Sequence, residues 1–159
     1  MYSIGDKVVY PMYGAGIIEA IEEQEFQGVI NKYYVMKMPM GDMKVMIPML
    51  NAEKIGIRNV IDVHEADKVL EEFSAINIDC DLSWNKRYRE NMVKIKGGDI
   101  YEVARVVKML MTRDRAKGLS TGEKKMLSSA KQILISELVL AKNISQEEIE
   151  TMFDAAFQQ

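Results

Sequence analysis

A cluster of cationic side chains follows the single tryptophan of the chain. Trp84 is followed by Lys86, Arg87 and Arg89, and Ser83 before it is suited to cap a helix that begins at the tryptophan. A flat apolar ring at a helix tip, with cations around it, could insert between base steps while the cations neutralise phosphates. These residues are therefore candidates for contact with a nucleic acid.

The spacing of the same stretch also allows an ordinary structural role for the tryptophan. Trp84, Tyr88, Met92 and Ile95 recur at helical intervals, as in the stripe of a helix that faces a core. Tryptophan is usually well buried in folded proteins. Residue spacing thus leaves two interpretations of Trp84 open, a core residue and an exposed wedge.

The cations belong to a strongly basic block inside an acidic chain. The net charge of the 159 residues is -3, but residues 84–132 carry 13 Lys/Arg against 5 Asp/Glu, a net charge of +8. An acidic protein with one basic block is expected to present that block to a polyanion. The alternative for any single lysine is that it only solvates a helix face.

Composition argues against several other kinds of chemistry. The chain is 48% hydrophobic and 28% charged, which predicts a globular protein. No apolar run approaches the roughly 18 residues of a membrane span, and the first ten residues do not have the layout of a signal peptide. We therefore expect a cytoplasmic protein without membrane contact.

Metal and thiol chemistry have little support in the sequence. One cysteine, Cys80, excludes an internal disulfide, and one histidine, His64, leaves a poor set of metal ligands. Asp79 and Asp81 flank the cysteine, which should raise the pKa of its thiol and disfavour a nucleophilic role. We expect no metal, no cofactor and no enzymatic activity.

The first part of the chain has the pattern of short β-strands. Strands are predicted at 7–10, 17–26, 32–38 and 43–48, with glycine-containing turns between them. Gly14 and Gly16 do not have the spacing of a phosphate loop and are assigned to a hairpin turn that needs positive φ. Several short strands in fewer than about sixty residues suggest a small SH3- or Tudor-like barrel over residues 1–57.

From residue 58 onward the hydrophobic period becomes helical. A short helix is predicted at 66–74, followed by a linker at 75–82, and further helices at 84–97, 100–118, between the caps Ser120 and Ser145, and up to about 157. Asp99 is expected to cap one of these helices, and Ser120 and Ser145 begin capping-box sequences. The predicted fold is therefore α+β, with a β-barrel at 1–57 and an all-helical bundle at 58–159 that contains the basic block.

Two groups of motifs resemble the CarD family of bacterial transcription regulators, and the resemblance covers almost the whole chain. The N-terminal group is GDKVVYP at 5–11 and GAG at 14–16, which is also similar to the polymerase-interaction module of transcription-repair coupling factors. The C-terminal group is WNKRYR at 84–89, GD at 98–99 and GLSTGEKKML at 118–127. Both groups on one chain without helicase segments indicate the short CarD-like subgroup.

The resemblance implies a monomeric, non-enzymatic regulator, associated with the nucleoid through RNA polymerase. Its barrel would bind the lobe of the polymerase β subunit, and its bundle would bind promoter DNA at the upstream edge of the bubble. The tryptophan would then wedge into the minor groove and stabilise the open complex. The residues implied in DNA binding are Trp84, Lys86, Arg87, Arg89 and Lys124.

The chain departs from the family at the strands expected to face polymerase. Family members often carry arginines at positions that match Gln24 and Met46. Neither residue can form a charge-assisted hydrogen bond, so polymerase binding here would depend on strand addition at the sheet edge and on apolar contact from Met46. A different class of function, an RNA- or ribosome-binding SH3-like module with a basic helical appendage, is the alternative.

Overall fold

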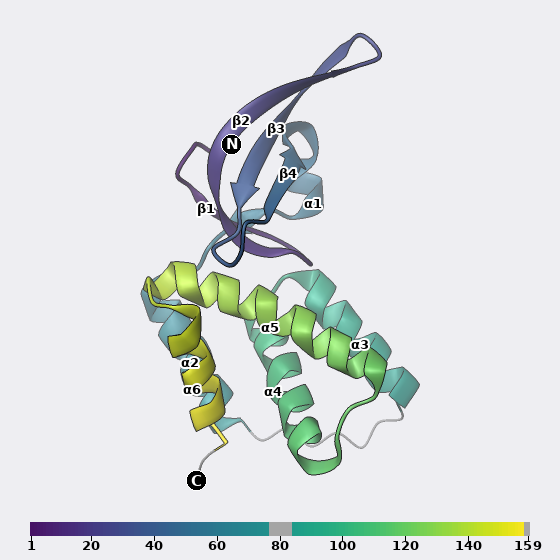
Figure 1. The fold of residues 1–159 in the computed structure, drawn as a ribbon, viewed down its shortest axis with the longest axis vertical. Helices are drawn as coiled ribbons and strands as arrows, with labels where there is room; N and C mark the ends of the chain where they lie inside the picture. The colour runs from purple at the N-terminus through teal and green to yellow at the C-terminus, as the bar shows by residue number, and fades with distance from the viewer. Residues whose placement is uncertain (77–83, 158–159) are drawn as a thin grey trace.

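The computed structural model describes residues 1–76 and 84–157, with Trp84 and Asn85 described only as backbone. A twisted antiparallel sheet lies on one side of the molecule and a group of helices on the other (Figure 1). The predicted linker at 75–82 and Cys80 lie almost entirely outside the described residues.

The β domain is an open five-stranded sheet. Its strands are β1 (Lys7–Tyr10), β2 (Gly14–Phe26), β3 (Val29–Lys37), β4 (Lys44–Pro48) and β5 (Arg58–Asn59), in the spatial order β4-β3-β2-β1-β5. Within residues 1–76 the edge strands β4 and β5 do not pair, so the expected barrel is a half-barrel. The 3₁₀ turn η1 (Met49–Asn51) and the short helix α1 (Ala52–Ile55) connect these edges and place Ala52 and Ile57 in the core. The sheet includes β5 and therefore extends two residues beyond the boundary predicted after residue 57.

The two glycines that the sequence assigned to the β1–β2 turn are required for different physical reasons. Gly14 has a φ of 112°, and together with Met12 at 77° it forms the β1–β2 turn, as the sequence predicted. Gly16 lies inside β2 without positive φ. A Cβ at Gly16 would be 2.5 Å from Met36 Cγ and 2.7 Å from the Lys37 carbonyl oxygen. Gly16 is therefore required for close approach of β3 and not for the turn.

The described residues after β5 form five helices, and the N-caps predicted for three of them are confirmed. The helices are α2 (Val63–Ala75), α3 (Trp84–Gly97), α4 (Ile100–Lys117), α5 (Thr121–Lys142) and α6 (Gln146–Ala155). Asp99, Ser120 and Ser145 each accept a hydrogen bond from a first-turn backbone N–H, which satisfies a donor that the helix cannot pair itself. One apolar core joins all five helices, and residues such as Phe73, Leu110, Leu134 and Phe153 are fully withdrawn from water.

Helix α5 lies directly against the sheet (Figure 1). Val9, Ala15 and Leu140 form a small buried apolar cluster there, and the Ala15 backbone N–H donates to Ser136 Oγ at 2.8 Å. The two parts of the chain therefore share a packed junction and are not joined by a linker alone.

Candidate nucleic-acid interface

The first two turns of α3 carry two of the predicted cations on the surface. Lys86 and Arg89 are both exposed. The helix begins at Trp84, as predicted from the Ser83–Trp84 boundary, but the Trp84 side chain and Ser83 lie outside the described part of the structure. The choice between wedge and core for Trp84 stays a prediction.

Arg87 is placed differently from the sequence-based expectation. Its side chain is 3% exposed, and its Nε and Nη2 donate to Glu123 Oε2 and Oε1 at 2.8 and 2.9 Å. This two-point pair with the Arg87 guanidinium holds the pKa of the buried Glu123 carboxyl below its usual range. A buried guanidinium cannot reach an external phosphate, so the structure gives Arg87 an internal structural role in place of the expected DNA contact.

The buried pair brings together two segments that are 36 positions apart. Arg87 follows the exposed Lys86 in α3, and Glu123 precedes the exposed Lys124 in the first turn of α5. The beginnings of α3 and α5 therefore lie at the same end of the bundle (Figure 1). We call the surface cations of this end, Lys86, Arg89, Lys124 and the adjacent Lys125, the basic corner.

The core-facing stripe of α3 is shifted by about one position from the predicted one. Arg87, Asn91 and Ile95 are buried, whereas the expected stripe residues Tyr88 and Met92 are half-buried beside the core. Because the centre of the stripe is polar, hydrophobic spacing alone could not locate it. Within residues 1–76 and 86–157, the buried Asn91 amide nitrogen and Arg113 Nε have no hydrogen-bond partner, and Arg113 Nε lies 3.9 Å from Glu123 Oε1.

The outer face of α3 extends the basic corner beyond the predicted residues. A shallow hollow of about 450 Å³ lies along it, and Val93, one of the residues that line it, is 70% exposed. The residues that line it recur at the spacing of one helix face, so the sequence pattern contained the signal that could have identified them. The hollow is lined by Lys86, Arg89, Glu90, Val93 and Lys94.

Two cations of the basic block are buried or neutralised: Lys108 is buried in the bundle, and the partly exposed Arg105 is paired with a carboxylate from outside the block. The Lys108 ammonium lies 5.0 Å from the centroid of the Phe73 ring and 4.4 Å from that of Phe157, and burial lowers its pKa. Arg105 pairs with Glu72 at 2.7 Å. The charge that the block presents to a polyanion is therefore smaller than its net charge of +8 suggests.

The two residues expected to face polymerase lie together on the sheet. Gln24 in β2 pairs with Asn31 in β3, and Met46 in β4 pairs with Val35, so alternation places all four on one face. Gln24 Nε2 lies 3.5 Å from Met46 Sδ, as a weak donor–acceptor contact. Met46 is 36% exposed and offers an apolar contact at the edge of the sheet.

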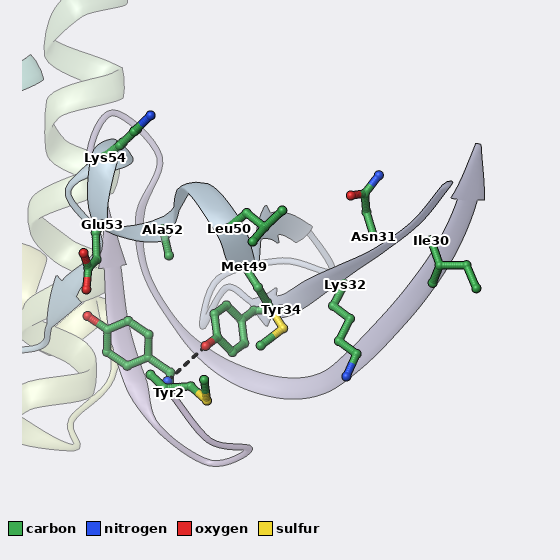
Figure 2. Close-up of a pocket in the computed structure, with 11 residues that line it drawn as sticks. Tyr2, Ile30, Asn31, Lys32, Tyr34, Met49, Leu50, Ala52, Glu53 and Lys54 are labelled. Atoms are coloured by element: carbon green, nitrogen blue, oxygen red, sulfur yellow. Dashed lines mark hydrogen bonds between the residues drawn. The ribbon is translucent and has the colours of Figure 1, made fainter. Parts of the chain in front are cut away.

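A hollow of about 630 Å³ opens on the opposite face of the same sheet (Figure 2). Tyr34 and Tyr2 are at its base: the Tyr2 backbone N–H donates to Tyr34 Oη, and Tyr2 Oη donates to the Ile57 carbonyl. Burial raises the pKa of Tyr2. Both hydroxyls thus anchor the N-terminal residues to the sheet. Among the described residues no group of three or more His, Cys, Asp or Glu side chains could hold a metal ion.

No helix in residues 1–76 and 84–157 is long and apolar enough to cross a membrane.

Comparisons with known proteins cover both parts of the chain. Residues 2–61 match the CarD-like/TRCF RID domain, and residues 68–154 match the CarD C-terminal domain. The chain is 44% identical over 151 residues to "Putative transcription factor YdeB" of Bacillus subtilis (strain 168), covering 95% of this chain and 99% of that protein. The open Tudor-like sheet, the helical bundle and these matches together show that the chain belongs to the CarD family of transcription regulators.

Proposed function

We propose that this protein binds the lobe of the RNA polymerase β subunit with its β domain and the minor groove of promoter DNA with its helical bundle. The β-domain face with Gln24 and Met46 contacts polymerase. The basic corner contacts phosphates at the upstream edge of the transcription bubble, where Trp84 wedges beside the last base pair. The protein acts as a monomer in the cytoplasm, at the nucleoid, without catalysis.

The observation that carries this proposal is the buried Arg87–Glu123 pair. It supports a single DNA-contacting surface because it fixes the start of α3, with Trp84, Lys86 and Arg89, beside Lys124 at the start of α5. Several cations on one surface suit a duplex–bubble junction, where phosphates are close, and the proposed wedge Trp84 would stack on the terminal base pair.

The energetic requirement on such a regulator is modest. It must bind the open complex more tightly than the closed one, and each tenfold preference corresponds to about 1.4 kcal/mol. Stacking of one aromatic side chain on a base contributes about 1–3 kcal/mol. The basic corner and Trp84 are therefore sufficient for a measurable extension of open-complex lifetime.

The test is the lifetime of the open complex on one promoter, with and without the protein. We expect the wild-type chain to prolong it. Lys86→Ala should shorten the prolonged lifetime without affecting polymerase binding, because phosphate contact is lost. Met46→Glu should weaken polymerase binding without affecting affinity for duplex DNA. Promoter footprinting provides the control, since an RNA-binding protein would give no protection at the edge of the bubble.

A further inference from the structure

Arg58 forms a dense set of hydrogen bonds at the junction between the two parts of the chain. Its Nη1 and Nη2 each donate to a carboxylate oxygen of Glu137 at 2.7 Å. Its Nε and Nη2 donate to the Gly98 carbonyl at 3.2 and 2.9 Å, and Nη1 also donates to the Asn59 carbonyl at 3.1 Å. All five N–H donors of the guanidinium are thereby used, which a lysine could not reproduce.

Arg58 connects its own strand to the end of one helix and the middle of another. Arg58 belongs to β5, Gly98 follows the last residue of α3, and Glu137 lies in α5. Glu137 is buried, with its side chain 3% exposed, and it also accepts from the backbone N–H of Ile61 at 3.0 Å. We call Arg58, Glu137 and the Gly98 carbonyl the junction clamp.

The two helices held by the junction clamp are the same two that form the basic corner. Helix α3 starts at the corner and ends at Gly97, beside the clamp. Helix α5 carries Lys124 at the corner and Glu137 at the clamp, 13 residues later, about 20 Å at 1.5 Å per residue. Both helices therefore run from the basic corner to the β domain.

We propose that Arg58 and Glu137 are positioning residues that hold the bundle in one orientation on the β domain, so that the basic corner lies at a set distance and angle from Gln24 and Met46. The effect of this orientation on open-complex lifetime rests on the proposed function, whereas the clamp itself is a property of the fold. Two sites that must engage polymerase and DNA together bind best when their relative placement is already fixed by the folded chain.

The other junction contacts in the described residues include fewer charge-assisted hydrogen bonds, so we expect them to constrain the orientation less. The apolar cluster there has only three buried residues, Val9, Ala15 and Leu140, and burial of apolar surface is non-directional. Two hydrogen bonds add fixed points, both on α5: the Ala15 backbone N–H donates to Ser136 Oγ at 2.8 Å, and Lys7 Nζ donates to the Leu140 carbonyl at 3.2 Å. Loss of the clamp should therefore leave the two parts in contact but free to adopt several orientations.

The test uses the full chain with Glu137→Gln, which keeps the shape of the side chain and removes its charge. The matched control is Glu72→Gln, because Glu72 pairs with Arg105 at 2.7 Å between α2 and α4, inside the bundle. Spin labels at Glu25→Cys in the β hairpin and Ser128→Cys in α5, both exposed positions, in a Cys80→Ser background report the distance between the two parts. We expect one narrow distance distribution for the wild type and the control, and a broad or shifted one for Glu137→Gln.

The functional arm compares affinities with open-complex lifetime for the same variants. Glu137→Gln should bind polymerase alone and duplex DNA alone as the wild type does, yet prolong the open complex roughly tenfold less, because the two contacts no longer occur together at the same effective concentration. Arg58→Lys, which retains the positive charge, is a second variant and should give the same loss. It carries the test if Glu137→Gln does not fold.

Each outcome separates the inference from the proposed function. A narrow, unchanged distance in both variants would show that the clamp does not fix the orientation and would overturn the inference. A broadened distance with wild-type open-complex lifetime would overturn the positioning role while leaving the proposed function intact. If the wild-type chain does not prolong the lifetime at all, the proposed function fails, and the distance distribution alone decides whether the clamp sets the orientation.

Discussion

At the scale of single residues, Glu123 takes part in the N-cap of α5 and in a buried ion pair, and the sequence predicted only the first of these roles. The capping-box pattern predicted its place near Ser120, and the Glu123 backbone N–H does donate to Ser120 Oγ at 3.2 Å. Its carboxylate is buried against Arg87, where a neutral replacement would leave a guanidinium without its counter-charge.

We expect Glu123→Gln to lower the free energy of unfolding at pH 7 by about 3 kcal/mol, since one partner of a buried ion pair is removed. Because Arg87 depresses the pKa of Glu123 in the folded state, the stability it contributes is present above the unfolded pKa of about 4.3. That stability is lost as the pH falls through the lower folded pKa. Urea unfolding of both proteins at pH 7 and pH 3 should show the difference shrinking in acid. A difference of the same size at pH 3 would contradict the assigned role of the carboxylate.

The second residue-scale prediction concerns Trp84→Ala. If the indole is an exposed wedge, truncation removes a stacking contact of about 1–3 kcal/mol, and the open complex should dissociate faster while polymerase binding is unchanged. If the indole is a core residue, the substitution should cost about 3–5 kcal/mol of folding stability. Melting temperature measured beside open-complex lifetime separates the two cases, and a large loss of melting temperature would rule out the wedge.

At the scale of elements, the β2–β3 pairing depends on the absence of a side chain at Gly16. We expect Gly16→Ala to destabilise the fold by about 1–3 kcal/mol, because the new methyl group would overlap Met36 and the Lys37 backbone. Gly97→Ala is the matched control, since a Cβ there meets nothing within 4 Å. Thermal melting should show a clear loss for Gly16→Ala alone, and equal melting temperatures would mean that β3 shifts to accommodate the methyl group.

At the scale of the whole molecule, the charge that reaches the surface sets the salt dependence of DNA binding. Three phosphate contacts, from Lys86, Arg89 and Lys124, predict a slope of log K against log salt of about -3. Lys124→Ala should reduce the slope by about 1 with little change in base preference. Lys32→Ala in the β domain is the control, because this exposed lysine lies far along the chain from the basic corner. Titration of a short duplex at several salt concentrations measures the slope, and a flat response would remove the electrostatic basis of the site.

The sequence by itself determined the local features of this protein. Strand and helix types and the caps at Asp99, Ser120 and Ser145 followed from periodicity and residue chemistry. These properties depend on neighbours within one or two turns of the chain, so a short window of sequence contains their causes.

Only the tertiary structure decided which arginines form ion pairs within the protein and which remain exposed. Arg87 finds Glu123 at a separation of 36 positions and Arg58 finds Glu137 at 79, and nothing in the local pattern distinguishes these arginines from the exposed Arg89. The choice depends on which helix faces pack together, since a guanidinium is buried only where a carboxylate is already placed to receive it. The junction clamp likewise depends on the packing of the sheet against α5, and the unpaired edges at β4 and β5 depend on which strands pair within the sheet.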